Sequence, residues 1–325
     1  MSTPTLSVLM PNYNHARFLP QAIEAVVSQS RRPDEFIIVD DASTDNSVEI
    51  IESYARQHPF MRLLRHEVNR GVIAGTETLI ATAKGDWLLF VSADDYVLPS
   101  FFAGAMEMAE RYPQAGIVFG QVAPVAKANE ERVPGTREVK RWREPLYASP
   151  ATFLRDFLQQ TPTWYSLTHS TIYRRTALQE MGGFQREVGH LSDTVAQRAL
   201  ALRYGACYLP QPCVTWRVTS GSFAAREGWD VEAMIRITQN LGTLLRSPGY
   251  RDWFPEDYVQ RWQRDLWAMT LEHYIWRLRE RYGRSAWGML RGRLLKRLLM
   301  LQVALQYHGD VAAFVRQRET PQEGG

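Results

Sequence analysis

The chain has 325 residues, of which 45% are hydrophobic and 22% are charged, and its formal net charge is +3. These proportions are those of a folded globular protein, and they exclude an intrinsically disordered chain. Its two cysteines, Cys207 and Cys213, lack CxxC spacing, which argues against both a disulfide scaffold and a cysteine zinc site.

The first hundred residues alternate short apolar runs with segments of helical periodicity. The apolar runs predict four buried strands, at Ser7–Met10, Phe36–Val39, Met61–Arg65 and Trp87–Val91. We expect Pro11 to end the first strand, and we expect one helix between each pair of strands. This β-α-β-α-β-α-β order predicts an α/β fold with a mostly parallel, Rossmann-like sheet that is flanked by helices.

Polar and acidic side chains stand where these strands end. Pro11 to Asn14 follow the first strand, Asp40 and Asp41 close the second, and the pair Asp94 and Asp95 follows the fourth. In open α/β sheets the ligand crevice lies outside the carboxyl ends of the strands. Adjacent carboxylates repel each other unless a cation compensates, and their hard oxygens suit Mg²⁺ or Mn²⁺. The alternative is an ordinary polar turn before the helix that follows Pro99.

The rest of the chain continues with mixed elements and ends in helices. A long polar segment at 126–144 is either a flap over a site or a solvated insertion. We therefore expect a domain over residues 1–225 and a helical extension over 226–325. The further elements predicted are helices at 99–111, 149–160, 192–204 and in 229–316, a short helix ending at Gly182, and strands at 117–120, 169–173, 206–209 and 214–218.

Several segments together resemble a known family. The first strand runs into PNYN and the second into VDDASTDNS, and NRG and AKGDW come next. The fourth strand then ends in SADD, and GGF and an acid at the start of a helix follow it. Over about residues 5–225 the chain resembles the inverting glycosyltransferases of family two, which have the GT-A fold. The resemblance implies transfer of a sugar from a nucleotide-sugar donor, with UDP-sugar favoured, to a hydroxyl of a surface polysaccharide or a lipid-linked glycan.

The resemblance also implies roles for individual residues. Asp41 faces the nucleotide base, Asp94 and Asp95 hold Mn²⁺ or Mg²⁺ with Asp95 as the first choice for direct ligand, and Asp193 is the catalytic base. Such a cation neutralises charge that develops on the leaving diphosphate, and a carboxylate can take the proton of the acceptor hydroxyl. The residues expected to bind the donor nucleotide are Pro11, Tyr13, Asn14, Asp40, Asp41, Asp86 and Asp94.

Four positions depart from the family pattern. Ser92 and Ser192 stand where many members have acids, and Thr76 and Glu77 stand where Arg and Asn are frequent. Asp193 is therefore also interpretable as an ordinary first-turn acid of its helix. A second hypothesis follows, in which the chain is a catalytically degenerate scaffold that binds a nucleotide or a protein partner through its helical tail. The absence of a QxxRW sequence favours single-sugar transfer over polymerisation.

The tail contains a basic amphipathic segment at 277–305. Such a helix either lies on an anionic membrane surface or packs on protein, in its own chain or in a second copy. No recognition motif for nucleic acid accompanies it, so we expect no nucleic-acid partner. With no secretory signal and no apolar run of spanning length in the sequence, we expect a cytoplasmic location, free or at the inner face of the cell membrane.

Overall fold

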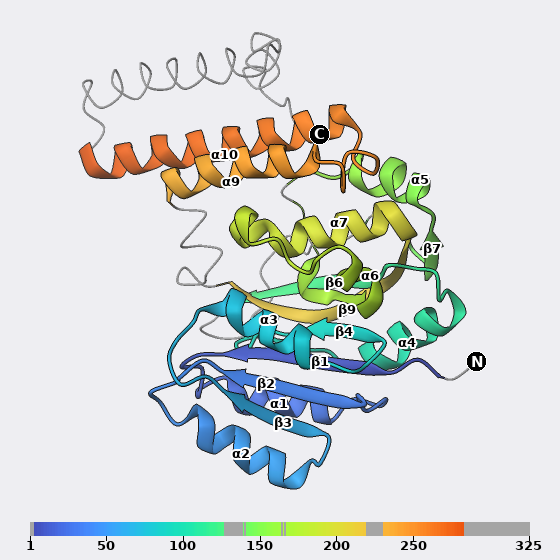
Figure 1. Cartoon of the computed structure of the whole chain (residues 1–325), viewed down its shortest axis with the longest axis vertical. Helices are drawn as coiled ribbons and strands as arrows, with labels where there is room; N and C mark the ends of the chain where they lie inside the picture. The colour runs from blue at the N-terminus through green and yellow to red at the C-terminus, as the bar shows by residue number, and fades with distance from the viewer. Residues whose placement is uncertain are drawn as a thin grey trace.

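A nine-stranded sheet with helices on both faces forms the centre of the molecule (Figure 1). The structure is a computed structural model and describes residues 3–126, 139, 141–163, 165, 167–218 and 230–282. The strand order is β3-β2-β1-β4-β8-β6-β9-β5, and β7 pairs with β9 beside this path. The predicted α/β class is confirmed. The strands are β1 (Leu6–Asn12), β2 (Glu35–Asp40), β3 (Met61–Arg65), β4 (Trp87–Phe90), β5 (Tyr96–Val97), β6 (Ile117–Ala126), β7 (Leu146–Ala148), β8 (Thr171–Arg174) and β9 (Ala206–Val218).

Helices cover the sheet in two layers, and two further helices lie beyond one of these layers (Figure 1). The helices are α1 (Leu19–Val27), α2 (Ser47–Gln57), α3 (Val72–Thr82), α4 (Phe101–Arg111), α5 (Pro150–Phe153), α6 (Arg175–Glu180), α7 (Ser192–Tyr204), α9 (Val231–Leu245) and α10 (Glu256–Tyr282). Short turns of other helix types are η1 (Leu154–Leu158), η2 (Thr168–Ser170) and η3 (Arg186–Leu191).

The sheet is parallel in one half and mixed in the other. β1 pairs in parallel with β2 and β4, and β2 pairs in parallel with β3, as the alternation of strands and helices predicts. β8 is antiparallel to both β4 and β6, whereas β6 and β9 are parallel to each other. The expected parallel sheet therefore covers only the first four strands of the chain.

Side-chain alternation along the strands creates two separate cores. In β1, Val8 and Met10 contribute to the core under α1, α2 and α4, while Leu9 points to the core under α3 and α7. Ile37 and Ile38 of β2 divide in the same way between the two faces. A strand buried on both faces must be apolar at nearly every position, which is why the sequence pattern identified these strands.

Several predicted elements have different bounds in the structure. β1 continues through Pro11 to Asn12, because beyond Leu9 it pairs only with β2 and the missing N–H of proline is tolerated there. The two strands predicted at 206–209 and 214–218 form one strand, β9, whose register on β6 shifts on either side of Gln121. The helix predicted at 149–160 is the short α5 followed by the π-helical turn η1.

The helices α9 and α10 share a core with the rest of the chain. Trp262 of α10 is fully buried, and the guanidinium carbon of Arg198 on α7 lies 4.0 Å from the centre of its ring. Asp265 accepts a hydrogen bond of 2.7 Å from the hydroxyl of Thr163. The boundary proposed at 225 falls within 219–229, and most of the basic segment 277–305 falls after 282, so both lie outside the described residues.

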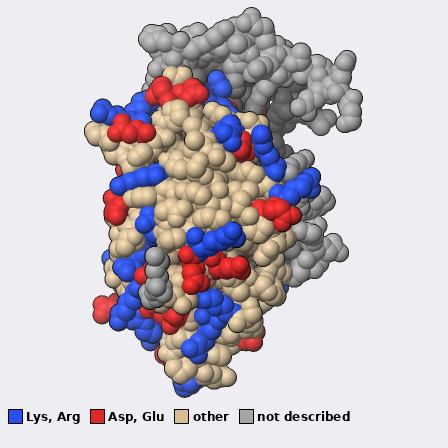
Figure 2. All heavy atoms as spheres, turned by 90° about the vertical axis from the view of Figure 1, so that its right-hand side faces the viewer, with Lys and Arg blue, Asp and Glu red and all other residues tan. Residues whose placement is uncertain are grey.

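The charged surface is mixed on the side of the molecule that lies to the right in Figure 1. Figure 2 shows Lys and Arg interspersed with Asp and Glu on the described part of this face. Among the described helices, none combines the length and the apolarity that crossing a bilayer requires.

Candidate active site

Three loops meet at the carboxyl ends of β1, β2 and β4. Asn12 and Asp40 are partners in the parallel pair of β1 and β2, and the amide of Asp41 donates to the carbonyl of Asn12 over 2.8 Å. On the other side of β1, the amide of Val91 donates to the carbonyl of Leu9 over 2.9 Å. The register of the sheet therefore brings the predicted loops 11–14, 40–41 and 92–95 to one edge.

Asp40 connects the loop after β1 to the loop after β2. Its side chain is buried, and it accepts hydrogen bonds from the Asn12 amide group (2.8 Å), the Ser43 hydroxyl (2.6 Å) and the Ser43 backbone amide (3.0 Å). These bonds tie the end of β1 to the turn after β2. Asp40 thus stabilises the loops that surround the crevice.

The loop after β1 is held by Asn14 and presents Tyr13. Asn14 has a left-handed backbone with a φ of 55°, and its side-chain oxygen accepts from the amides of Thr44 (2.7 Å) and Asp45 (3.3 Å). Tyr13 is 42% exposed, which is high for a large aromatic side chain. The predicted residues Tyr13 and Asn14 therefore have different positions, one facing outward and the other inside the loop.

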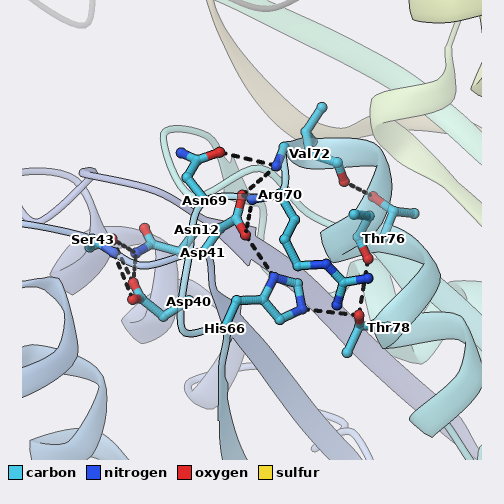
Figure 3. A network of polar contacts seen from close by, with 12 residues as sticks. Asn12, Asp40, Asp41, Ser43, His66, Asn69, Arg70, Val72, Thr76 and Thr78 are labelled. Carbon is cyan, nitrogen blue, oxygen red and sulfur yellow. Dashed lines mark hydrogen bonds and ion pairs between the residues drawn. The ribbon is translucent and has the colours of Figure 1, made fainter.

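Asp41 is the centre of a compact polar network (Figure 3). One carboxylate oxygen lies 2.6 Å from Nδ1 of His66 and accepts from the amide of Arg70 over 2.9 Å. The other accepts from the amide of Gly71 over 2.7 Å and from that of Arg70 over 3.1 Å. Gly71 has a φ of 85° and precedes α3, so this one carboxylate fixes both the loop 66–71 and the start of the helix.

His66 links this carboxylate to α3. Its Nε2 lies 3.1 Å from the hydroxyl oxygen of Thr78, and that hydroxyl donates to the carbonyl of Ala74 over 3.0 Å. Both ring nitrogens therefore lie close to side-chain oxygen atoms, one on β2's acidic turn and one on α3. Burial raises the pKa of Asp41, but the hydrogen bonds from Arg70, His66 and Gly71 outweigh burial and hold its pKa below the usual value.

The acidic pair after β4 is held by β9. The amide of Arg217 donates to Oδ1 of Asp95 over 2.7 Å, and its guanidinium donates to the carbonyl of Asp94 and to the side chain of Gln21. Arg217 is only 2% exposed and lies between the rings of Phe18 and Tyr96. Its burial and these hydrogen bonds make Arg217 a structural cation that joins β9 to the acidic pair.

The second carboxylate oxygen of Asp95 faces His169. Oδ2 lies 3.6 Å from Nδ1 of His169, a distance too long for a hydrogen bond. The imidazole stacks on Trp216 with ring centres 5.4 Å apart and planes 26° apart. His169 immediately precedes β8, whose antiparallel pairing with β4 places it beside the acidic pair. No local pattern around His169 predicts this neighbour.

Asp193 lies in the first turn of α7, after the turn η3. One of its oxygens accepts from the amide of Thr194 over 2.6 Å. The residue at the N-cap of α7 is Leu191, whose side chain makes no capping hydrogen bond, and Ser192 is the first residue of the helix. Further along α7, Gln197 donates to the hydroxyl of Thr171 over 2.8 Å, which anchors the helix at the first residue of β8.

Asp86 lies away from the other predicted donor-binding residues. It precedes β4, so it stands at the amino edge of the sheet, opposite the crevice. Its carboxylate accepts from the amide (2.9 Å) and the hydroxyl (2.7 Å) of Thr5. The expectation that Asp86 binds the donor is therefore corrected: Asp86 fastens the start of β1 to β4.

The side chains at this edge of the sheet are too few to hold a divalent cation unless a bound phosphate group supplies further oxygen atoms. Asp94, Asp95 and His169 supply oxygen and nitrogen atoms there, yet no group of three His, Cys, Asp or Glu side chains in the described part of the chain is arranged to bind a metal. A divalent cation bound to phosphate oxygens and water needs only one or two carboxylates from protein. The residues present therefore fit a cation that binds together with a phosphate group.

Comparisons with known proteins identify the family of the chain. The pattern of the family described as "Glycosyl transferase family 2" matches residues 7–182. A relative named "Uncharacterized glycosyltransferase YibD", from Escherichia coli strain K12, is 41% identical over 108 residues, which are 33% of this chain and 31% of that protein. The chain thus spans about a third of the length of that curated relative.

Solved structures share the fold. Staphylococcus aureus TarS 1-349 in complex with UDP has a TM-score of 0.59 and 20% identity, covering 83% of this chain and 72% of that one. The mannosyltransferase PcManGT from Pyrobaculum calidifontis, in complex with GDP-Man and Mn²⁺, has a TM-score of 0.56 and 17% identity, covering 98% and 80%. At these identities the likeness shows a common fold.

Proposed function

The chain belongs to glycosyltransferase family 2, and from this premise we propose that it transfers a single sugar from a uridine diphosphate sugar to a hydroxyl of a glycan. In this proposal a divalent cation assists the reaction, and the anomeric configuration is inverted. The acceptor is a surface polysaccharide or its lipid-linked precursor. The observation that carries the proposal is the convergence of the Asp41 network and the acidic pair at one edge of the sheet.

The hydrogen bonds of Asp41 support uridine as the nucleoside. A carboxylate offers about four acceptor positions. His66 and the amides of Arg70 and Gly71 use three directions, and the Arg70 amide reaches both oxygens. One position at most remains for a base. Uracil and thymine each present a single ring N–H, whereas guanine presents two adjacent donors and cytosine presents no ring N–H. The network therefore favours the uracil type of pyrimidine over guanine and cytosine.

The other predicted donor-binding residues contact the nucleoside or position the loop that does so. Pro11 and Tyr13 line the nucleoside side of the crevice, and Tyr13 offers an exposed ring on which a base can stack. Asn14 and Asp40 hold the loop that carries them. The structural relatives bind comparable donors: TarS has been crystallised with UDP-GlcNAc, and PcManGT with GDP-Man and Mn²⁺.

The acidic pair is proposed to hold Mn²⁺ or Mg²⁺ with the diphosphate. Asp95 turns Oδ2 away from β9 and toward the crevice, while Oδ1 is occupied by the amide of Arg217. Asp94 is half-buried beside it and serves the cation or the ribose. When bound, the cation supplies positive charge to the oxygens of the departing diphosphate.

Asp193 is proposed as the general base. Its half-buried carboxylate stands at the start of α7, on the side of the crevice formed by β8. It accepts the proton of the acceptor hydroxyl while that oxygen attacks the anomeric carbon from the face opposite the diphosphate. Attack from that face inverts the configuration.

A thermal-shift and calorimetric screen tests the proposal. The purified chain is titrated with UDP, GDP, dTDP and CMP, each with and without Mn²⁺. We expect UDP with Mn²⁺ to raise Tm, because a ligand that binds only the native state stabilises it. Stabilisation by GDP in preference to UDP would contradict the uridine assignment. No response to any nucleotide would favour the degenerate scaffold, in which the helical tail binds a partner.

A further inference from the structure

We propose that His169 is a ligand of the divalent cation, so that Asp95 Oδ2 and His169 Nδ1 together form the protein's half of the metal site. The inference rests on the proposed function, since the diphosphate of the donor supplies other ligands. It assigns a nitrogen atom to a site in which the sequence suggested only carboxylate oxygens.

The distance between the two atoms carries the argument. Oδ2 of Asp95 and Nδ1 of His169 are 3.6 Å apart, and among the described residues neither atom has a hydrogen-bond partner. Two neighbouring ligands of an octahedral cation with bonds of about 2.1 Å lie about 3.0 Å apart. A shift of roughly 0.6 Å, within the reach of a side-chain torsion, would therefore place one cation between them.

Both ligands are fixed by consecutive residues of one strand. The amide of Arg217 holds Oδ1 of Asp95 at 2.7 Å, which directs Oδ2 toward His169. The ring of Trp216 stacks on the imidazole and sets its plane. Partners that orient a ligand are a regular feature of metal sites in proteins. Here β9 orients both ligands from residues that are adjacent in sequence.

The two proposed ligands differ in how deeply their side chains are buried. The Asp95 side chain is 6% exposed, and the His169 side chain is 29% exposed. A carboxylate this deeply buried gains from a positive partner, because the low polarity around it strengthens the attraction. The more exposed imidazole faces the side from which a nucleotide-bound cation would enter. Imidazole nitrogen suits first-row transition metals and carboxylate oxygen suits Mn²⁺, so the mixed pair fits Mn²⁺ better than Mg²⁺.

Pulsed electron paramagnetic resonance on Mn²⁺ gives a direct test. The full chain is loaded with MnCl₂ and UDP, and the electron spin-echo envelope is recorded for ¹⁴N modulation from a directly bound nitrogen. Diphosphate and water contain no nitrogen, so this modulation reports a protein ligand. We expect the modulation in the wild type, a changed pattern after labelling with ¹⁵N-histidine, and its loss in His169→Phe.

The phenylalanine variant keeps a ring against Trp216 while removing both nitrogens. We expect its Mn²⁺ affinity in the presence of UDP to fall at least about tenfold, with UDP affinity in the absence of metal unchanged. His58→Phe is the matched control, because His58 precedes β3 at the opposite edge of the sheet. Bound Mn²⁺ without nitrogen modulation would overturn the inference and leave the proposed function standing. Failure of the wild type to bind Mn²⁺ with UDP would overturn both.

Discussion

The two sides of the crevice are built by different forces. On the proposed donor side, which the loops after β1 and β2 form, hydrogen bonds position these loops: Asp40 and Asp41 accept seven between them from Asn12, Ser43, His66 and the amides of Arg70 and Gly71. On the proposed acceptor side, which β6, β8 and α7 form, aromatic packing predominates: Phe119, Phe153, Phe157 and Trp142 contact one another in one core.

This difference has a functional meaning. A hydrogen-bonded loop next to a nucleotide pocket keeps polar groups in defined directions, as recognition of a base requires. A hydrophobic core defines shape without presenting polar groups, which leaves the surface above it free to vary with the acceptor. The acceptor side also depends on α9 and α10, since Asn240 of α9 donates to the carbonyl of Glu187 in η3, just before Asp193.

The largest effect is expected from Asp193→Asn. Removing the base should lower the transfer rate by about 10²- to 10⁴-fold, while UDP affinity stays unchanged because the donor side is intact. Transfer rate and UDP affinity are measured on the same preparation. Asp252→Asn, at a carboxylate 76% exposed, is the control. Retention of most of the activity by Asp193→Asn would assign Asp193 to helix structure only.

The next effect is structural and belongs to the acceptor side. Trp262→Ala should lower the free energy of unfolding by about 3–5 kcal/mol, because Trp262 is fully buried against Arg198. Chemical denaturation measures this change. Met269→Ala, on the same helix but 42% exposed, should change it by less than about 0.5 kcal/mol. Equal effects of the two variants would show that α10 does not share the core.

A smaller effect is expected from Asp41→Asn on the donor side. The variant leaves backbone amides poorly paired, which costs about 1–3 kcal/mol, and UDP affinity should fall both with and without Mn²⁺. Glu67→Gln, at an exposed position of the neighbouring loop, is the control. A loss of UDP affinity that occurs only in the presence of Mn²⁺ would place Asp41 in the metal site instead.

The difference in stability between the wild type and Asp41→Asn should depend on pH. The native pKa of Asp41 is lower than its value of about 3.9 in the unfolded chain. Above the unfolded-state pKa, ionised Asp41 therefore stabilises the native state fully. This stabilisation disappears as the pH falls through the native pKa. The difference in Tm between wild type and Asp41→Asn should thus be constant near neutral pH and shrink below about pH 4. A difference that grows on acidification would contradict the ionised state.

The smallest effect is expected from Glu77→Gln. Glu77 of α3 pairs with Arg186 of η3 across the two sides, and both side chains are largely exposed to solvent. Solvent and salt screen such pairs, so Tm should change little, and the change should vanish in concentrated salt. A large loss of Tm that persists in concentrated salt would mean that the Glu77–Arg186 pair contributes substantially to the stability of the native state.

The sequence by itself determined the parallel half of the fold and the edge at which the site lies. Strands buried on both faces are apolar at every position, so Phe36–Val39 and Trp87–Val91 were visible without a structure, and the acids that follow them had to lie at one edge. The error at Asp86 was avoidable by the same logic, because that residue precedes its strand. His66, which directly follows β3, carried the same signal and was missed.

Only the tertiary structure decided which side chains serve these acids. His66 meets Asp41 across 25 residues of sequence, and the amide of Arg217 meets Asp95 across 122. His169 reaches Asp95 because β8 inserts antiparallel between β4 and β6, a strand order that no local pattern specifies. Local periodicity reports which residues are buried, whereas the pairing of distant strands decides which of them touch, since it depends on the packing of the whole chain.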